Sequence, residues 1–290
     1  MDFKELRYFK RLPATNDSIV PTSKVINLSG VFGEDNETTR FITRYLRTTH
    51  CDLFFADGAI LVEGAAEYML LPHFIHNSYA KLNQRYITLL EINGRHSQRL
   101  KPLIEKLCLP TLVITDIDSG APEGYHAHIL PERGKGIIST NYAITKWLVN
   151  ENSLDKLLTL PEDKKVKDFA TPYPFKIRIA YQTSVSISYD GSDVEAIPST
   201  FEDCLVYTNY DLFSEAKCDG LIGDINNLCN QKLVFNDFHE KIYNLFRGNN
   251  VSKASFALDL IYSVDPQKLQ VPEYINKGLL WLQDLLDKHE

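Results

Sequence analysis

The sequence predicts an α/β fold in which a parallel sheet is flanked by helices. Between Phe55 and Asp118, apolar strand-like segments alternate with helical segments, and crossovers of this kind join parallel strands. The 290 residues are 44% hydrophobic, enough to bury the core of one large domain or about two smaller ones. The five cysteines contain no CxxC pair, which argues against a disulfide framework or a cysteine zinc site. We expect a globular protein of the reducing cytoplasm.

The alternating region gives the first elements in order. Its apolar runs predict strands at 58–64 (GAILVEG), 85–92 (RYITLLEI) and 111–118 (TLVITDID). Helical periodicity predicts helices at 65–79, interrupted or started around Pro72, and at 97–108. The carboxyl ends of these strands are then the edge at which ligands of open parallel sheets bind.

The later elements follow from changes in periodicity. Residues 119–140 carry Gly, Pro and charge and are expected to form a loop, and two short helices should follow at 141–148 and 152–160. A β-rich stretch, 174–191, ends in an Asp-Gly turn. A helix capped by Thr200 comes next, and the last part of the chain reads as mainly helical. Its final helix should bury an apolar stripe of Ile275, Leu279, Leu282 and Leu286.

Charge limits the classes of partner. The charged N-terminus and the lack of an 18-residue apolar run predict neither export nor membrane insertion. A net charge of -7 counts against nucleic acid, because phosphate binding depends on Lys and Arg. However, Arg40, Arg44 and Arg47 fall on one helix face, which is either a solvated face or a basic contact surface.

Acidic residues gather at the predicted strand ends. Glu63 ends the first strand, and Asp116 and Asp118 share one side of the third if that strand continues through them. Glu67 follows one helical turn after Glu63. Two such charges about 4 Å apart repel by roughly 4 kcal/mol at an effective dielectric of about 20, so a cluster requires protons or cations. Carboxylate-only ligation favours Mg²⁺ or Mn²⁺; the alternative is that each acid is an ordinary cap or turn residue.

Other chemistry has weaker support. The chain has neither a GxxxxGK[ST] phosphate loop nor a GxGxxG dinucleotide fingerprint. The pairs His73/His76 and His126/His128 have no cysteine near them, so packing or surface roles are favoured over zinc. Cys204 reads as a small buried hydrophobic residue.

The motifs together resemble a known family. ILVEGAAE followed by LVITDIDS is similar to the TOPRIM fold, in which a strand-end Glu and a DxD pair bind metal. The longer FADGAILVEGAAEYMLLP, with PSTFEDCL, VSKASFALDL and STNYAITKWL in the same order, resembles the overcoming lysogenization defect (OLD) family of nucleases, which also includes the Gabija defence nuclease. The similarity covers almost the whole chain and implies a TOPRIM core with helical elaborations.

The resemblance also implies roles for individual residues. It places two Mg²⁺ or Mn²⁺ ions in a DNA endonuclease site used in phage defence or DNA repair, and it makes Lys253 and Glu63 catalytic. The metal ligands that it implies are Glu63, Glu67, Asp116, Asp118, Glu202 and Asp203. For Asp203, a role as an N-terminal helix acid stays equally open.

Family members carry an ATPase ahead of the nuclease region, and the segment ELRYFKRLP resembles the exit from it. The resemblance therefore implies an ATPase partner, as a missing N-terminal domain or a separate subunit, and leaves a homodimer open. Expected boundaries are 1–50 for a linker and helix, 51–225 for the TOPRIM core with a helical insertion at about 140–170, and 226–290 for a helical part. Two other classes remain open: a non-catalytic DNA-binding or assembly module, and an enzyme acting on a small phosphate or nucleotide.

Overall fold

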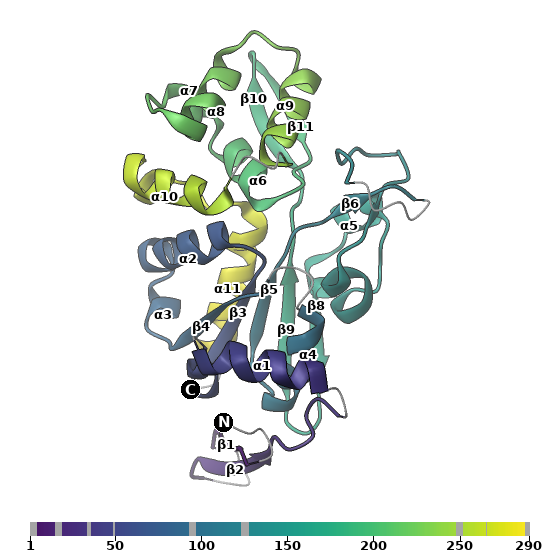
Figure 1. Cartoon of the computed structure of the whole chain (residues 1–290), viewed down its shortest axis with the longest axis vertical. Coiled ribbons are helices and arrows are strands. Elements are labelled where there is room, and N and C mark those ends of the chain that lie inside the picture. The colour runs from purple at the N-terminus through teal and green to yellow at the C-terminus, as the bar shows by residue number, and fades with distance from the viewer. Residues whose placement is uncertain are drawn as a thin grey trace.

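A mixed sheet forms the centre of the molecule. The computed structural model describes residues 5–14, 19–33, 36–48, 50–92, 97–122, 128–247, 252–264 and 266–287. The sheet has five strands in the order β4-β3-β5-β9-β8 (Figure 1). All neighbouring pairs are parallel except β8 with β9, which are antiparallel. The strands are β3 (Gly58–Val62), β4 (Ile87–Glu91), β5 (Thr111–Ile114), β8 (Val166–Phe169) and β9 (Phe175–Ala180). The predicted α/β class with a parallel sheet is confirmed.

Helices cover both faces of this sheet, which explains why its central strands are apolar throughout. Every residue of β3 and β5 is buried, as expected for strands between two helical layers. One layer contains α2 (Ala65–Ser78), α6 (Phe201–Thr208), α10 (Lys253–Ser263) and α11 (Glu273–Asp287). The other contains α1 (Asn36–Thr48), α4 (Ser97–Leu107), the π-helical η3 (Ala143–Leu148) and α5 (Leu154–Leu158).

The C-terminal helix α11 packs directly on the sheet. Its predicted apolar stripe is buried, and a Cβ added at Gly278 would lie 2.9 Å from Cδ1 of Leu112 in β5. Glycine therefore allows the helix to approach the strand closely. The C-terminal part shares the core of the sheet, and the domain boundaries given above stay predictions.

Two local differences from the expected elements affect the site. Strand β5 ends at Ile114, so Asp116 and Asp118 lie in the irregular segment after the strand, not within it. Asp118 has a left-handed φ of 48°, and alternation along a strand therefore does not fix its direction. In addition, α2 continues through Pro72 without interruption.

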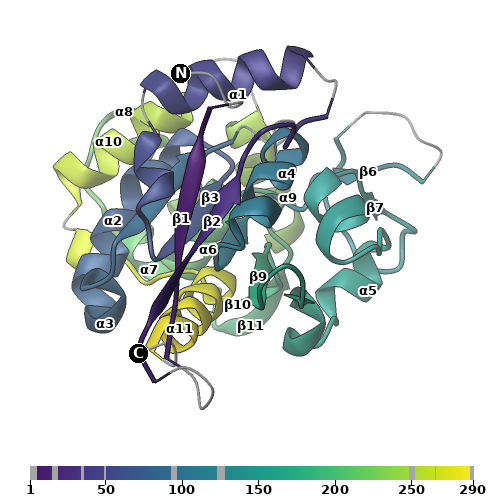
Figure 2. The ribbon, with the colours of Figure 1, turned by 90° about the horizontal axis from the view of Figure 1, so that it is seen from below.

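The remaining elements extend the molecule at both ends of the sheet. An N-terminal hairpin, β1 (Arg7–Leu12) and β2 (Thr22–Asn27), lies opposite the carboxyl ends of the strands (Figures 1 and 2). The predicted Asp190–Gly191 turn joins β10 (Val185–Tyr189) to β11 (Ser192–Ala196). Two-residue strands, β6 (Ser119–Gly120) and β7 (Ile138–Ser139), occur in the expected loop. The others are α3 (Ala80–Asn83), α7 (Tyr210–Glu215), α8 (Gly220–Asn230), α9 (Phe235–Arg247), η1 (Cys51–Phe54), η4 (Glu162–Lys165) and η5 (Pro266–Lys268).

Two expectations about composition can be compared with the structure. All five cysteines are free thiols, and Cys204 is fully buried, in agreement with a packing role. In the parts of the chain that are described, no helix has the length and apolar character needed to cross a membrane.

Candidate functional site

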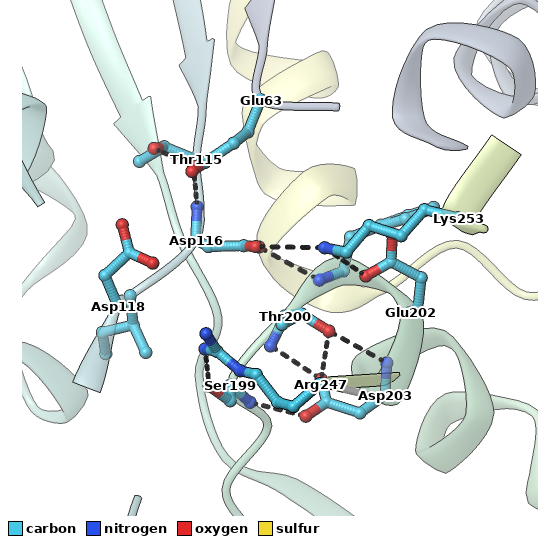
Figure 3. A network of polar contacts seen from close by, with 12 residues as sticks. Glu63, Thr115, Asp116, Asp118, Ser199, Thr200, Glu202, Asp203, Arg247 and Lys253 are labelled. Carbon is cyan, nitrogen blue, oxygen red and sulfur yellow. Dashed lines mark hydrogen bonds and ion pairs between the residues drawn. The ribbon is translucent and has the colours of Figure 1, made fainter. Parts of the chain in front are cut away.

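The predicted acids lie at the carboxyl ends of β3 and β5, where α2, α6 and α10 begin (Figure 3). Some of these residues lie in the segments directly after the two strands. The others lie in the first turns of helices that pack against this edge of the sheet. The residues that meet here are Glu63 after β3, Asp116 and Asp118 after β5, Glu67 in α2, Glu202 in α6 and Lys253 in α10. Positions far apart in sequence thus form one charged cluster, which we call the acid cluster.

Glu63 connects the two strand ends. Its Oε2 accepts hydrogen bonds from the Thr115 hydroxyl at 2.6 Å and from the Asp116 backbone N–H at 2.7 Å. Burial and then the negative charges of Asp116 and Asp118 raise its pKa to about 8, despite these two hydrogen bonds. Glu63 therefore carries a proton at neutral pH when no cation is bound.

Asp116 lies at the centre of the acid cluster. Its Oδ1 accepts hydrogen bonds from the Gln182 side-chain amide at 2.7 Å and from the Phe201 backbone N–H at 3.1 Å. Its Oδ2 is 3.7 Å from the Lys253 ammonium. Gln182 also accepts the Ile117 N–H at 2.8 Å, so the strand end and the start of α6 hold this carboxylate in one orientation.

Asp118 points to the side of the cluster away from Lys253 (Figure 3). The Asn141 side-chain amide donates to its Oδ2 at 3.1 Å and to the Thr115 hydroxyl at 2.8 Å. Burial and the charge of Asp116 raise its pKa to about 6, although Asn141 and the nearby Arg247 act in the opposite direction. The backbone at Asp118 is left-handed, and the two carboxylates point to different sides of the segment after β5 (Figure 3).

Glu202 and Lys253 form the other side of the cluster. The Lys253 Nζ is 2.9 Å from Glu202 Oε2, and the glutamate side chain is fully buried. Oε1 of Glu202 has no hydrogen-bond partner among the described residues. Burial lowers the pKa of Lys253, but the charges of Asp116, Glu202 and Glu67 outweigh this and raise it overall. The lysine is therefore a firmly charged ammonium ion between two carboxylates.

Glu67 belongs to the same side. It is 3% exposed, and burial together with the charges of Glu202 and Asp116 raises its pKa well above the usual value. The charge of Lys253 only partly opposes this increase. The surplus of negative charge is thus shared by both sides of the acid cluster.

Asp203 is next to Glu202 in sequence but has different partners. Its Oδ2 and Oδ1 accept the backbone N–H groups of Ser199 and Thr200, each at 2.8 Å, and Thr200 completes a capping box at the start of α6. Burial raises its pKa to about 7. Both of its oxygens are used to hold the turn that leads into α6.

Several residues of this network were absent from the sequence prediction. They are Thr115, Asn141, Gln182, Ser199 and Arg247. Gln182 could have been predicted from the sequence, because it is a polar residue just after the carboxyl end of β9, the neighbour of β5. Asn141 and Arg247 had no local signal, since tertiary packing alone brings the segment before η3 and the end of α9 to the cluster.

The donor set fits a hard divalent cation. The charged oxygen donors of the cluster are all carboxylates, and one buried oxygen of Glu202 lacks a partner among the described residues. The Lys253 ammonium lies between Asp116 and Glu202. Within the described ranges, no three His, Cys, Asp or Glu side chains already converge in an arrangement that could hold a metal ion. Ligation would therefore require the carboxylates to rearrange around the cation.

The other candidate residues lie elsewhere or cannot be placed. His73 and His76 are on α2 and belong to no such metal-binding group, and His126 lies outside the described residues. Arg40 and Arg44 are exposed on α1, whereas the side chain of Arg47 lies outside the description.

Comparison with known proteins agrees with the resemblance carried by the motifs at the strand ends. Residues 54–118 match the model of a family described as overcoming lysogenization defect protein-like, TOPRIM domain. This stretch of the chain is thus similar to an OLD-like TOPRIM domain. It is also 28% identical over 257 residues to a protein of Bacillus cereus named Endonuclease GajA. This match covers 87% of the chain but 35% of the relative, so the chain spans about a third of that protein's length.

Similar solved structures come from the C-terminal regions of OLD proteins. The region from Burkholderia pseudomallei is 18% identical, with a TM-score of 0.44 over 80% of this chain and 99% of that one. The region from Xanthomonas campestris pv. campestris is 17% identical, with a TM-score of 0.43 over 82% of this chain and 97% of that one.

Proposed function

We propose that this chain is a divalent-metal-dependent DNA endonuclease that hydrolyses phosphodiester bonds with two Mg²⁺ or Mn²⁺ ions. The observation that carries the proposal is the acid cluster, in which carboxylates from β3, β5, α2 and α6 meet a single lysine. The likeness to a relative named as an endonuclease and the OLD-like TOPRIM domain support it. When bound, two such ions activate water and stabilise the leaving oxyanion of a phosphodiester.

The cluster divides into two sets of candidate ligands that share Asp116. The charges of Asp116 and Asp118 act on Glu63, which groups these three acids, and the charges of Glu202 and Asp116 act on Glu67, which groups these three as well. We propose that each set holds one ion. Asp116 is suited to a shared position because Gln182 and the Phe201 N–H orient its carboxylate.

Lys253 has a proposed role of its own. Its ammonium contacts Glu202 and Asp116, and cations bound by these acids would leave it free to face the scissile phosphate. A fixed positive charge at this place stabilises the negative charge that develops during hydrolysis. For Asp203, its two backbone hydrogen bonds favour a positioning role at the start of α6 over direct ligation.

The partners follow from the same relatives. We propose that DNA is the substrate and that an ATPase module, either preceding this chain or on a separate subunit, controls the nuclease in a cytoplasmic phage-defence or DNA-repair protein. The domain boundaries predicted from sequence form part of this proposal.

A plasmid assay tests the function. Supercoiled plasmid is incubated with the chain in Mg²⁺, Mn²⁺, Ca²⁺ or EDTA, alongside Glu63→Ala and Lys253→Ala. We expect nicking or linearisation that requires metal and falls at least about 100-fold in both variants. Glu37→Ala and Lys81→Ala, which remove exposed members of ion pairs outside the acid cluster, are the matched controls and should keep full activity.

An inactive wild type would be followed by calorimetry on the same samples. Metal binding without cleavage would show a nuclease that requires its ATPase. No metal binding would overturn the proposal and favour the non-catalytic module.

A further inference from the structure

Arg247, the last residue of α9, lies beside the acid cluster and has no role in the proposal so far. Its Nη2 donates to the Ser199 hydroxyl at 2.7 Å, and its guanidinium lies 5.5 Å from the centre of the Tyr243 ring. Figure 3 shows the guanidinium on the Asp118 side of the cluster. Its charge is close enough to Asp118 to oppose the rise in the pKa of that carboxyl.

The guanidinium keeps hydrogen-bonding capacity that nothing in the described chain uses. Its Nε is buried and has no hydrogen-bond partner among the described residues. The Nε of Arg178 is also buried without such a partner, but Arg178 and Arg133 form ion pairs with Glu162 and Glu195. Arg247 forms none with any carboxylate in the described ranges, and a guanidinium with free donors in a planar fork is suited to a phosphate group.

The position of Arg247 depends on the turn before α6. Ser199, which accepts the hydrogen bond from Arg247, donates its own backbone N–H to Asp203 at 2.8 Å. The capping box that starts α6 therefore also holds the hydroxyl that orients the arginine. A side chain fixed in this way loses little conformational entropy when it binds an anion.

The two cations lie on opposite sides of Asp116. Lys253 contacts Oδ2 of Asp116 and Glu202, whereas Arg247 lies near Asp118 and also near His128, whose pKa it lowers in addition to the effect of burial. A phosphate backbone that crosses the cluster would meet Lys253 at one side and Arg247 at the other. Neighbouring phosphates along one strand are several ångströms apart, so a single phosphate does not need to reach both.

We infer that Arg247 binds a DNA phosphate next to the scissile one and so sets the position of the strand across the acid cluster. This inference rests on the proposed nuclease function and adds a residue that positions the substrate. Because the contact is made equally in the ground state and the transition state, its loss should raise KM far more than it lowers kcat.

The test compares Arg247→Met and Arg247→Lys with Arg133→Met as the matched control. Binding of a labelled DNA duplex to the full chain is measured by fluorescence anisotropy in Ca²⁺ over a range of salt concentrations. We expect Arg247→Met to weaken binding about tenfold and to reduce the salt slope by about 1, with partial recovery in Arg247→Lys. Arg133→Met and the affinity for Mg²⁺, measured by calorimetry, should stay unchanged.

The outcomes separate this inference from the proposed function. If the wild type binds DNA and Arg247→Met binds it equally well, the inference is wrong while the nuclease proposal stands. A change in Mg²⁺ affinity without a change in DNA affinity would make Arg247 a counter-ion of Asp118 and would also overturn the inference. If the wild type binds Mg²⁺ but not DNA, the inference is wrong while the nuclease proposal stands, and if it binds neither Mg²⁺ nor DNA, both proposals fail.

Discussion

Two clusters of partly buried charge in this molecule have opposite balances. Around Glu162, three cations surround one glutamate: Lys165 at 3.0 Å, Lys277 at 3.9 Å, and Arg178, which is 6% exposed on β9. Burial raises the pKa of Glu162, but these cations outweigh it and the pKa is lowered. In the acid cluster, burial and neighbouring acids act together, and the pKa of Glu63 rises to about 8.

The two networks differ in charge balance. The Glu162 network has its counter-ions within the chain, and we call it the finished network; the acid cluster has more acids than cations. The cations at Glu162 have their counter-ion within the chain, so the network contributes to stability without any ligand. In the acid cluster, Lys253 is the one cation in ion-pair contact with the acids among the described residues. Several acids with raised pKa values and one cation between them are the pattern expected of a functional site, and the proposed metal ions would balance this charge.

The largest stability effect should come from the finished network. Glu162→Gln leaves Arg178 and Lys165 without their counter-ion, and we expect the free energy of unfolding to fall by about 2 kcal/mol at pH 7. This value is below that for a fully buried pair because the Glu162 side chain is 41% exposed. The folded-state pKa is below the unfolded one, so the contribution is present above the unfolded pKa and is lost as pH falls through the lower folded pKa.

Urea denaturation of the wild type and the variant measures this effect. Glu151→Gln, which removes a partner of the exposed Lys156, is the control and should change stability by less than about 0.5 kcal/mol. Equal stability of Glu162→Gln and wild type would contradict the comparison.

The same contrast explains how much of the site the sequence predicted. Glu63 and Asp116 could be placed together because carboxyl ends of parallel strands meet at one edge, a rule that needs no knowledge of side-chain packing. The two-residue spacing of Asp116 and Asp118 suggested a shared side of a strand, but β5 ends at Ile114 and a left-handed residue sets the direction instead. Both acids follow β5, but alternation along a strand does not set their directions, and Asp118 points away from the Lys253 side that Asp116 contacts (Figure 3).

Glu202 and Lys253 came from the family resemblance alone. An acid or a lysine in the first turn of a helix is common, and nothing local distinguishes these two from solvent-exposed residues. Their meeting depends on how α6 and α10 pack on the sheet edge. Arg247 carries no local signal for the same reason.

A second prediction concerns the protons that the acid cluster holds. With pKa values of about 8 for Glu63 and about 6 for Asp118, a cation must displace protons in order to bind near neutral pH. We expect Mg²⁺ affinity to rise with pH between these values, by up to about tenfold per pH unit for each displaced proton. Calorimetry in buffers of different ionisation enthalpy measures the released protons directly. An affinity that does not change with pH would show that these acids are not the ligands.

The smallest expected effect is that of a glutamate-to-glutamine substitution in the acid cluster, Glu63→Gln. Glu63→Gln keeps an oxygen that can accept the hydrogen bonds from Thr115 and Asp116, and it removes a carboxyl group whose ionisation is disfavoured in the folded state. Because the folded pKa of about 8 is above the usual 4.5, wild-type stability falls as pH rises through this window, and the glutamine variant avoids that loss.

In metal-free buffer we therefore expect Glu63→Gln to raise the free energy of unfolding by about 1 kcal/mol at pH 7 and to have little effect near pH 4.5. This is less than the roughly 3 kcal/mol of an isolated group with this pKa, because Glu63 shares the protons of the cluster with its acidic neighbours. Thermal denaturation at both pH values tests the sign. In Mg²⁺ the wild type should be the more stable of the two proteins, because the ion stabilises the wild type and the variant lacks one of the proposed ligands. If Glu63→Gln destabilises the metal-free protein as Glu162→Gln does, the carboxylate of Glu63 supports the fold itself, and the acid cluster is a second finished network with no requirement for cations.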